Sequence, residues 1–141
     1  MEAFICAIRN RELDAIRRFF LNRNPSDIQR HFINRIHRTS SIHFGSHFHY
    51  ETSPLHEAAS RGDVSILAFL VQNGGNVNLE LSNGKTPLHM ASMYNRVYVV
   101  RYLLDKGADP TIQCVEGFTP KREAAIRNYT LIIDIFTSFP K

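Results

Sequence analysis

Two segments of this 141-residue chain are nearly identical and begin 33 residues apart. They read SPLHEAASRGD from Ser53 and TPLHMASMYNR from Thr86, and a third segment, TPKREAAIRNY from Thr119, keeps the opening but loses the middle. The same shift superposes Pro54, Pro87 and Pro120; Ala58, Ala91 and Ala124; Gly74 and Gly107; and Gly84 and Gly117. A fixed period of this length with matching positions predicts an array of stacked units, each packed only on its neighbours.

The residue types of each unit predict two helices. Ser53, Thr86 and Thr119 are good N-cap residues, and the proline after each suits the first helical position, where its missing N–H costs nothing. A second apolar segment at helical spacing follows, and a glycine-containing break ends it. The expected helix pairs are Glu2–Asn10 with Leu13–Asn22, Pro54–Arg61 with Val64–Asn73, Pro87–Asn95 with Val97–Lys106, and Pro120–Asn128 with Thr130–Thr137.

The segments SPLHEA and TPLHMA resemble the T-P-L-H-x-A motif of ankyrin repeats, and GGNVN and GADPT resemble the loop after the second helix of such a repeat. The chain is therefore similar to the ankyrin-repeat family. The resemblance implies an all-α fold, an ankyrin-repeat solenoid of stacked helix-turn-helix units. The last unit has Lys121 and Arg122 where the motif has Leu and His. Because a terminal unit has one face without a neighbour, we expect it to be a C-terminal cap.

The N-terminal segment fits a divergent first unit that is separated from the others by an insertion. Its apolar positions match the second unit at an offset of 51, which is 18 residues more than the period; the matches are Ala7 with Ala58, Leu13 with Val64, Ile16 with Leu67, and Phe19 with Leu70. Asn24, Pro25 and Asp27 have the pattern of a helix start, so we expect an extra helix at about Pro25–His37. The expected divisions are a first unit at 1–23, an insertion with the extra helix and a histidine-rich loop at 24–50, repeats at 51–83 and 84–116, and a capping repeat at 117–141.

The net charge of +4 lies in the first 50 residues, which carry eight arginines and four acids. Aromatic residues are interleaved with these arginines, and phosphate attraction combined with base stacking would make a nucleic-acid surface. The same spacing also fits helices with an apolar face inward and arginines outward. Nucleic-acid binding by the Arg-rich N-terminal half is therefore the alternative function; its residues are Arg9, Arg11, Arg17, Arg18, Arg23, Arg30, Arg35 and Arg38, with Phe19, Phe20 and Phe32.

The segment IHFGSHFHY contains three histidines, and imidazole is a good zinc ligand. Their spacings conflict, because His43 and His47 share a face only on a helix, whereas His47 and His49 share a face only on a strand. We therefore expect no specific metal site there, even with Glu51 as a fourth ligand. For the histidines of the repeat motif, His56 and His89, the resemblance implies structural hydrogen bonds between adjacent turns.

The chain shows no pattern typical of an enzyme or of a cofactor site. It has no phosphate-binding loop, and its acids are scattered singly rather than paired. We expect no catalytic residue, no cofactor and no membrane partner. The two cysteines, Cys6 and Cys114, form no motif and are read as free thiols of an intracellular protein, cytoplasmic or nuclear.

The resemblance implies a protein–protein interaction module, or adaptor, that presents its turn tips and the exposed face of its first helices to another protein. A stack of helix pairs leaves such a concave face free to vary. The expected partner-binding residues are Tyr50, Thr52, Glu57, Arg61, Asn83, Lys85, Met90, Met93, Tyr94, Glu116, Phe118, Glu123 and Arg127. The C-terminal segment LIIDIFTSF is more apolar than one buried face requires, so we also expect a further contact there, with a second copy or with the tail through Phe139.

Overall fold

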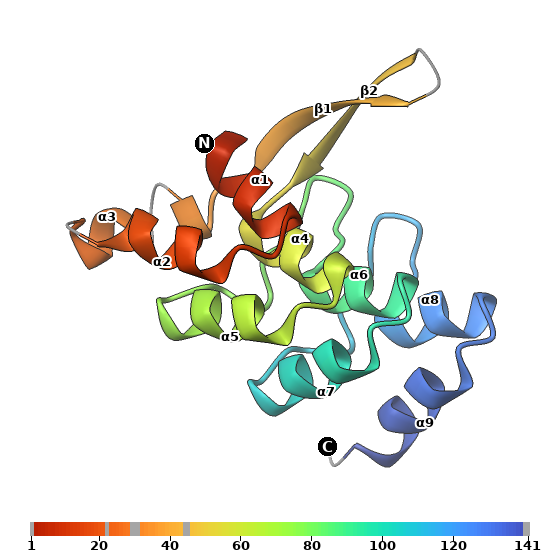
Figure 1. Cartoon of the computed structure of the whole chain (residues 1–141). Coiled ribbons are helices and arrows are strands. Elements are labelled where there is room, and N and C mark those ends of the chain that lie inside the picture. The colour runs from red at the N-terminus through yellow and green to blue at the C-terminus, as the bar shows by residue number, and fades with distance from the viewer. Residues whose placement is uncertain (1, 22, 29–31, 44–45, 140–141) are drawn as a thin grey trace.

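The structure is a computed structural model that describes residues 2–21, 23–28, 32–43 and 46–139. Within these residues, eight helices form four antiparallel pairs (Figure 1). The pairs are α1 (Glu2–Arg9) with α2 (Leu13–Phe20), α4 (Pro54–Arg61) with α5 (Val64–Gln72), α6 (Pro87–Met93) with α7 (Val97–Asp105), and α8 (Pro120–Ile126) with α9 (Thr130–Ser138). Each helix begins at the predicted residue and ends within two residues of the predicted end.

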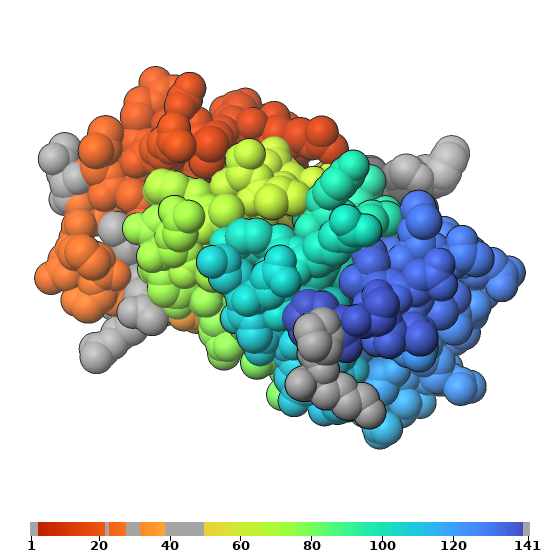
Figure 2. Space-filling model, turned by 90° about the horizontal axis from the view of Figure 1, so that it is seen from below, coloured from red at the N-terminus to blue at the C-terminus, as the bar shows by residue number. Residues whose placement is uncertain are grey.

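The pairs stack in chain order into a helical solenoid. The first helices of the pairs form one row, in which α1 packs on α4, α4 on α6, and α6 on α8. In the second row α5 packs on α7 and α7 on α9. Seen from below, the units lie side by side from the N-terminal to the C-terminal end of the molecule (Figure 2). The predicted all-α repeat solenoid is confirmed.

Caps fix where the first helices begin. The Ser53 hydroxyl accepts a hydrogen bond from the His56 backbone N–H, and Thr86 does the same for His89. Thr119 caps α8 in the same way, although this unit lacks the Leu and His of the motif. Each such cap contributes about 1 kcal/mol, so the sequence signal has a direct energetic basis.

Equivalent positions of successive units fill one continuous core. Leu55 and Leu88 are fully buried, and so are the small residues Ala58, Ala91 and Ala124, which let neighbouring first helices approach closely. In the second row the buried positions also repeat with the period: Ile66, Val99 and Ile132, and Leu70 and Leu103. Burying a side chain of the size of Leu or Ile contributes about 1.5–3 kcal/mol, so the stack is held together chiefly by this repeated apolar seam.

The insertion differs from the prediction. Of the extra helix expected at Pro25–His37, the described residues contain α3 (Pro25–Ile28) and helical backbone of the π type at Phe32 and Ile33, and the backbone is non-helical from Asn34. His37 instead opens a strand, β1 (His37–His43), which pairs antiparallel with β2 (Ser46–Thr52). The expected histidine-rich loop is thus a β-hairpin that projects beside α1 and α4 (Figure 1). Residues 29–31, in the middle of the predicted helix, lie outside the described residues.

Asn34 shows how the insertion is divided. Its side-chain carbonyl accepts a hydrogen bond from the Asn76 N–H at 2.7 Å, just as the Asn78 side chain accepts from the Asp109 N–H at 2.8 Å. Asn76 and Asp109 are one period apart, which makes Asn34 the counterpart of Asn78. Asn34 and Asn78 lie 44 residues apart, which is 11 more than the period. Of the 18 inserted residues, 11 therefore follow Asn34, on the hairpin side, and the remaining 7 precede it, on the α3 side.

The hairpin stands where the later units have short turns, here called the finger loops (residues 80–85 and 113–118). In both finger loops a backbone bond closes the turn, from Leu81 N–H to Lys85 O and from Cys114 N–H to Phe118 O, each at 3.0 Å. Neighbouring fingers are tied together, because the Glu51 carboxylate accepts from the Ser82 N–H at 3.1 Å. The hairpin and the two finger loops, together called the fingers, therefore form a row along the first helices.

Candidate functional site

A hollow of about 540 Å³ lies between the fingers and the helices α4 and α6, and is here called the concave hollow. Nine of the predicted partner-binding residues line it: Tyr50, Thr52, Glu57, Arg61, Asn83, Lys85, Met90, Met93 and Tyr94. The period explains this, since residues 33 apart occupy equivalent places in adjacent units and their side chains face the same groove. Of the other predicted residues, Glu116, Phe118, Glu123 and Arg127 belong to the next unit and do not line it.

The centre of the concave hollow is apolar. Met90 and Met93 are half-buried on α6, and Tyr94, the residue after this helix, is 50% exposed. The Lys85 ammonium lies 3.3 Å from the Met93 sulfur, so its aliphatic stem helps to cover this centre. Flexible thioethers and an exposed tyrosine ring suit contact with a partner side chain, because they bury apolar area and adapt in shape.

On one side of this centre, the Glu57 carboxylate holds a charged cluster together. It accepts a hydrogen bond from the Arg9 guanidinium at 3.0 Å, and Arg9 also donates to the Tyr50 hydroxyl. Arg61, one turn further along α4, lies 3.9 Å from the other carboxylate oxygen. Glu57 is 5% exposed, so this cluster joins the first unit to the second rather than offering a free carboxylate.

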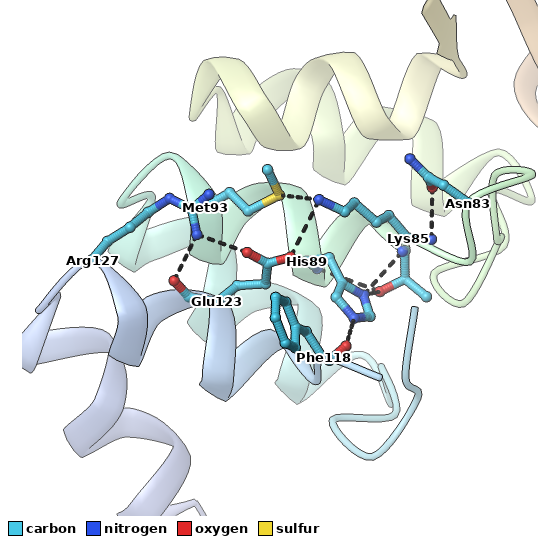
Figure 3. A network of polar contacts seen from close by, with 8 residues as sticks. Asn83, Lys85, His89, Met93, Phe118, Glu123 and Arg127 are labelled. Carbon is cyan, nitrogen blue, oxygen red and sulfur yellow. Dashed lines mark hydrogen bonds and ion pairs between the residues drawn. The ribbon is translucent and has the colours of Figure 1, made fainter. Parts of the chain in front are cut away.

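On the other side, Glu123 is at the centre of a second cluster (Figure 3). Its carboxylate pairs with the Lys85 ammonium at 3.2 Å and with the Arg127 guanidinium at 2.7 Å. Burial alone would raise the pKa of Glu123, but the hydrogen bonds from Arg127 and Lys85 outweigh it and hold the pKa below its ordinary value. The carboxylate therefore stays ionised and links two successive units.

The two clusters are equivalent by sequence. Glu57 and Glu123 lie two periods apart, and the intervening position is Met90. The middle unit thus replaces a buried ion-pair carboxylate by a thioether, which is why the apolar centre lies between two charged clusters. Thr52, which is 3% exposed, is buried like the two carboxylates. We infer that Thr52, Glu57 and Glu123 support the surface, whereas the exposed side chains meet the partner.

The last unit presents a different surface. Phe118 is half-buried under the Arg122 guanidinium, whose carbon lies 5.1 Å from the ring centre, and its carbonyl accepts from His89. Glu116 and Arg127 are exposed. These residues extend the face of the concave hollow without lining the hollow itself.

The hydrogen bonds implied for the motif histidines are confirmed. The His56 Nε2 lies 2.9 Å from the Lys85 carbonyl, and the His89 Nε2 lies 2.8 Å from the Phe118 carbonyl (Figure 3). Because the Thr86 N–H donates to the His89 Nδ1, the ring is neutral and its Nε2 carries the proton. Burial lowers the pKa of His56 to about 4, and burial likewise lowers the pKa of His89. Both rings are structural links between units.

Sequence reasoning missed three residues that line the concave hollow, namely Glu51, Leu81 and Arg96. The sequence does not indicate that Glu51 and Leu81 line the hollow, because the position of the fingers depends on backbone pairing. Arg96 carried a signal, since it stands one period after Asp63, the acid whose side chain caps α5. A basic residue at a position where the preceding unit has a capping acid is a departure from the repeat.

The expectation that no metal is bound stays a prediction. His43, His47 and His49 lie in the hairpin, with His47 opposite Ile42 and His49 opposite Ser40, but their side chains lie outside the described residues. Within the part of the chain that is described, no group of three or more His, Cys, Asp or Glu residues could hold a metal ion.

The aromatic residues of the Arg-rich half contact one another. The rings of Phe4 and Phe19 stack at 4.8 Å between centres, and Phe19 meets Phe32 edge to face at 4.9 Å. The Arg23 guanidinium lies 3.9 Å above the Phe19 ring. These rings pack among the first unit, the insertion and, through Phe20 on Phe69, the second unit, so they are not arranged as a free platform for stacking bases.

The fold and the concave hollow define a repeat-type binding scaffold. A family model for ankyrin repeats in three copies matches residues 4–114 of the chain. The chain belongs to the ankyrin-repeat family. Helices α8 and α9 lie beyond the match and add a fourth helix pair. No curated protein matches the sequence. Ankyrin repeats are generally protein–protein interaction modules and typically non-enzymatic. Among the described residues, no helix is long and apolar enough to cross a membrane.

Proposed function

We propose that this protein is a non-enzymatic adaptor that binds another protein through the concave hollow and the neighbouring fingers. The observation that carries the proposal is the apolar centre formed by the half-buried Met90 and Met93 and the exposed Tyr94, between two ion-pair clusters. Interface energy concentrates in a few aromatic, Met and Arg side chains that are surrounded by less important contacts. The clusters hold the backbone of this face in place, so a partner meets a preformed surface.

An intracellular setting, cytoplasmic or nuclear, is part of this proposal. It is supported by the two cysteines, which are free in the structure, Cys6 exposed and Cys114 buried. Exposed free thiols are typical of proteins kept in a reducing compartment. Self-association through the C-terminal helix is a separate possibility that the proposal does not require.

Affinity capture with matched variants tests the proposal. The wild-type chain, the double variant Tyr94→Ala/Phe118→Ala and the control Leu21→Ala are used as baits on lysate of the native cell. Leu21 is 65% exposed at the end of α2, away from the concave hollow, so its loss removes a similar exposed apolar surface. A protein retained by wild type and control but lost on the double variant supports the proposal. Equal capture of every protein by all three baits contradicts it.

A further inference from the structure

A second, smaller hollow adjoins the concave hollow and is strongly basic. It has a volume of about 240 Å³ and lies at the turns that follow α4 and α6. Three arginines line it, Arg11, Arg61 and Arg96, and it is here called the basic hollow. The remaining lining residues are Gly62, Asn95, Val97, Tyr98 and Val99, so no carboxylate is among the described residues that line it.

The two hollows are neighbours, because Arg61 and Arg96 line both. The turns that carry them stand side by side at one end of the first helices (Figure 1). Two arginines of the basic hollow therefore also line the hollow that contains Tyr94, so one bound segment can contact both hollows.

The three guanidinium groups use few of their donors within the chain. Arg11 donates to the Arg61 carbonyl at 3.0 Å, and the Arg96 Nε donates to the Ser60 carbonyl at 2.8 Å. The nearest ion pair, between Arg61 and Glu57, is long at 3.9 Å, and the Arg61 side chain is 47% exposed. An arginine has five N–H donors, so these backbone bonds hold Arg11 and Arg96 in place and leave further donors that can bind a ligand.

The replacement of Asp63 by Arg96 in the next unit explains the missing negative charge. In α5 the Asp63 side chain accepts from the Ile66 N–H at 3.1 Å, whereas no side chain caps α7, which Arg96 precedes. The position that holds a capping acid in one unit thus holds an arginine in the next. Three positive charges without a lining carboxylate attract an acidic group from outside the chain.

Resting on the proposed function, we propose that the partner binds as a protein segment in which a large apolar side chain stands close to aspartate or glutamate residues. The apolar side chain packs against Met90, Met93 and Tyr94 in the concave hollow. The carboxylates bind Arg11, Arg61 and Arg96 in the basic hollow. The basic hollow thereby sets which segments are accepted, and at which end of the groove their acids lie.

Selection from a phage-displayed library of short random peptides, with the full chain as bait, tests this inference. We expect enriched peptides to combine a large apolar residue with neighbouring acids. Synthetic copies should bind the double variant Arg61→Gln/Arg96→Gln about 5- to 10-fold more weakly, the loss expected for two partly exposed ion pairs. The control Arg101→Gln/Lys106→Gln removes the same charge from the exposed side of α7 and should leave the affinity nearly unchanged.

The outcomes separate the two proposals. Peptides that need Tyr94 but carry no acids, and that bind the arginine variant normally, overturn the inference and leave the proposed function standing. If no enriched peptide loses affinity on Tyr94→Ala, both fail. Single-stranded DNA of mixed sequence is the further probe. The inference is wrong if this DNA binds the wild type but not Arg61→Gln/Arg96→Gln and no acidic peptides are enriched. The basic hollow would then bind nucleic-acid phosphates. Should that variant unfold, the exposed Arg11→Gln serves in its place, with a smaller loss expected.

Discussion

At the scale of single residues, one backbone position recurs between the two helices of every unit. Arg11, Gly62, Asn95 and Asn128 have left-handed backbones, with φ of 59°, 77°, 57° and 58°. Glycine adopts this conformation freely and asparagine with little strain, whereas other residues lose about 1–2 kcal/mol. Arg11 is the exception, and it lies in the divergent first unit.

Replacing Gly62 by alanine should therefore destabilise the protein by about 1–2 kcal/mol. The new Cβ would also lie 2.7 Å from the Arg96 Cδ, a flexible side chain that has to move. Asn95→Gly, at the equivalent position of the next unit, is the matched control and should leave stability unchanged or slightly higher. Urea unfolding of the three proteins measures the difference. A Gly62→Ala protein as stable as wild type would refute the argument.

The buried motif histidines predict that stability falls in mild acid. Burial lowers the pKa of His56 to about 4 from an ordinary value near 6.5, so the unfolded chain takes up the proton first. The stabilisation is complete above pH 6.5 and decreases as the pH falls towards 4. His56 alone should reduce the free energy of unfolding by about 2 kcal/mol between pH 7 and pH 5. Urea unfolding at the two pH values measures this, with His56→Gln as the control whose pH dependence is weaker; equal wild-type stability at both would contradict it.

At the scale of helices and strands, local signals predicted the four helix pairs because caps, prolines and apolar spacing act within a few residues of each end. The hairpin could not be predicted in the same way. The segment HRTSSIH lacks a clear apolar alternation, so although Phe48 and Tyr50 alternate with polar residues in SHFHYET, its pairing partner could not be identified; what holds the two together is the backbone pairing from His37–Thr52 to His43–Ser46. Pro25 and Asp27 indicate a helix start, but nothing in the sequence marks that the backbone is non-helical from Asn34.

The C-terminal helix is predicted to be essential. In α9, Ile132 and Ile135 are buried, and Phe139 beyond it packs on the same core. This contact is the intrachain alternative expected for the apolar C-terminal segment. Deletion of residues 130–141 uncovers α7 and the second side of α8, so the protein should unfold or aggregate. Circular dichroism and size-exclusion chromatography test this. A soluble truncation with a cooperative unfolding transition would show that α8 suffices as the cap.

At the scale of the whole molecule, the repeat explains why predicted residues distant in sequence line one hollow. The family resemblance and the period together predict that Tyr50, Glu57 and Met90 share one face, and the stack brings them together. The spacing of Glu57 with Arg61 and of Glu123 with Arg127 is visible in the sequence, but the pairs with Arg9 and Lys85 are not, because these partners belong to other units. Contacts between units depend on the stacking geometry, which one unit's sequence does not contain.

The most direct test of the central claim is the affinity of the captured partner for two sets of variants, measured at low and high salt. Our account predicts that Tyr94→Ala weakens binding by about 1–3 kcal/mol, with no loss of stability because the ring is half exposed. Substitution of Arg17, Arg18, Arg30 and Arg35 should change the affinity little, and the affinity should depend only modestly on salt concentration. The adaptor function is contradicted if Tyr94→Ala leaves the affinity unchanged while substitution of these arginines lowers it and the affinity falls steeply with salt. That result would identify a nucleic-acid-binding protein.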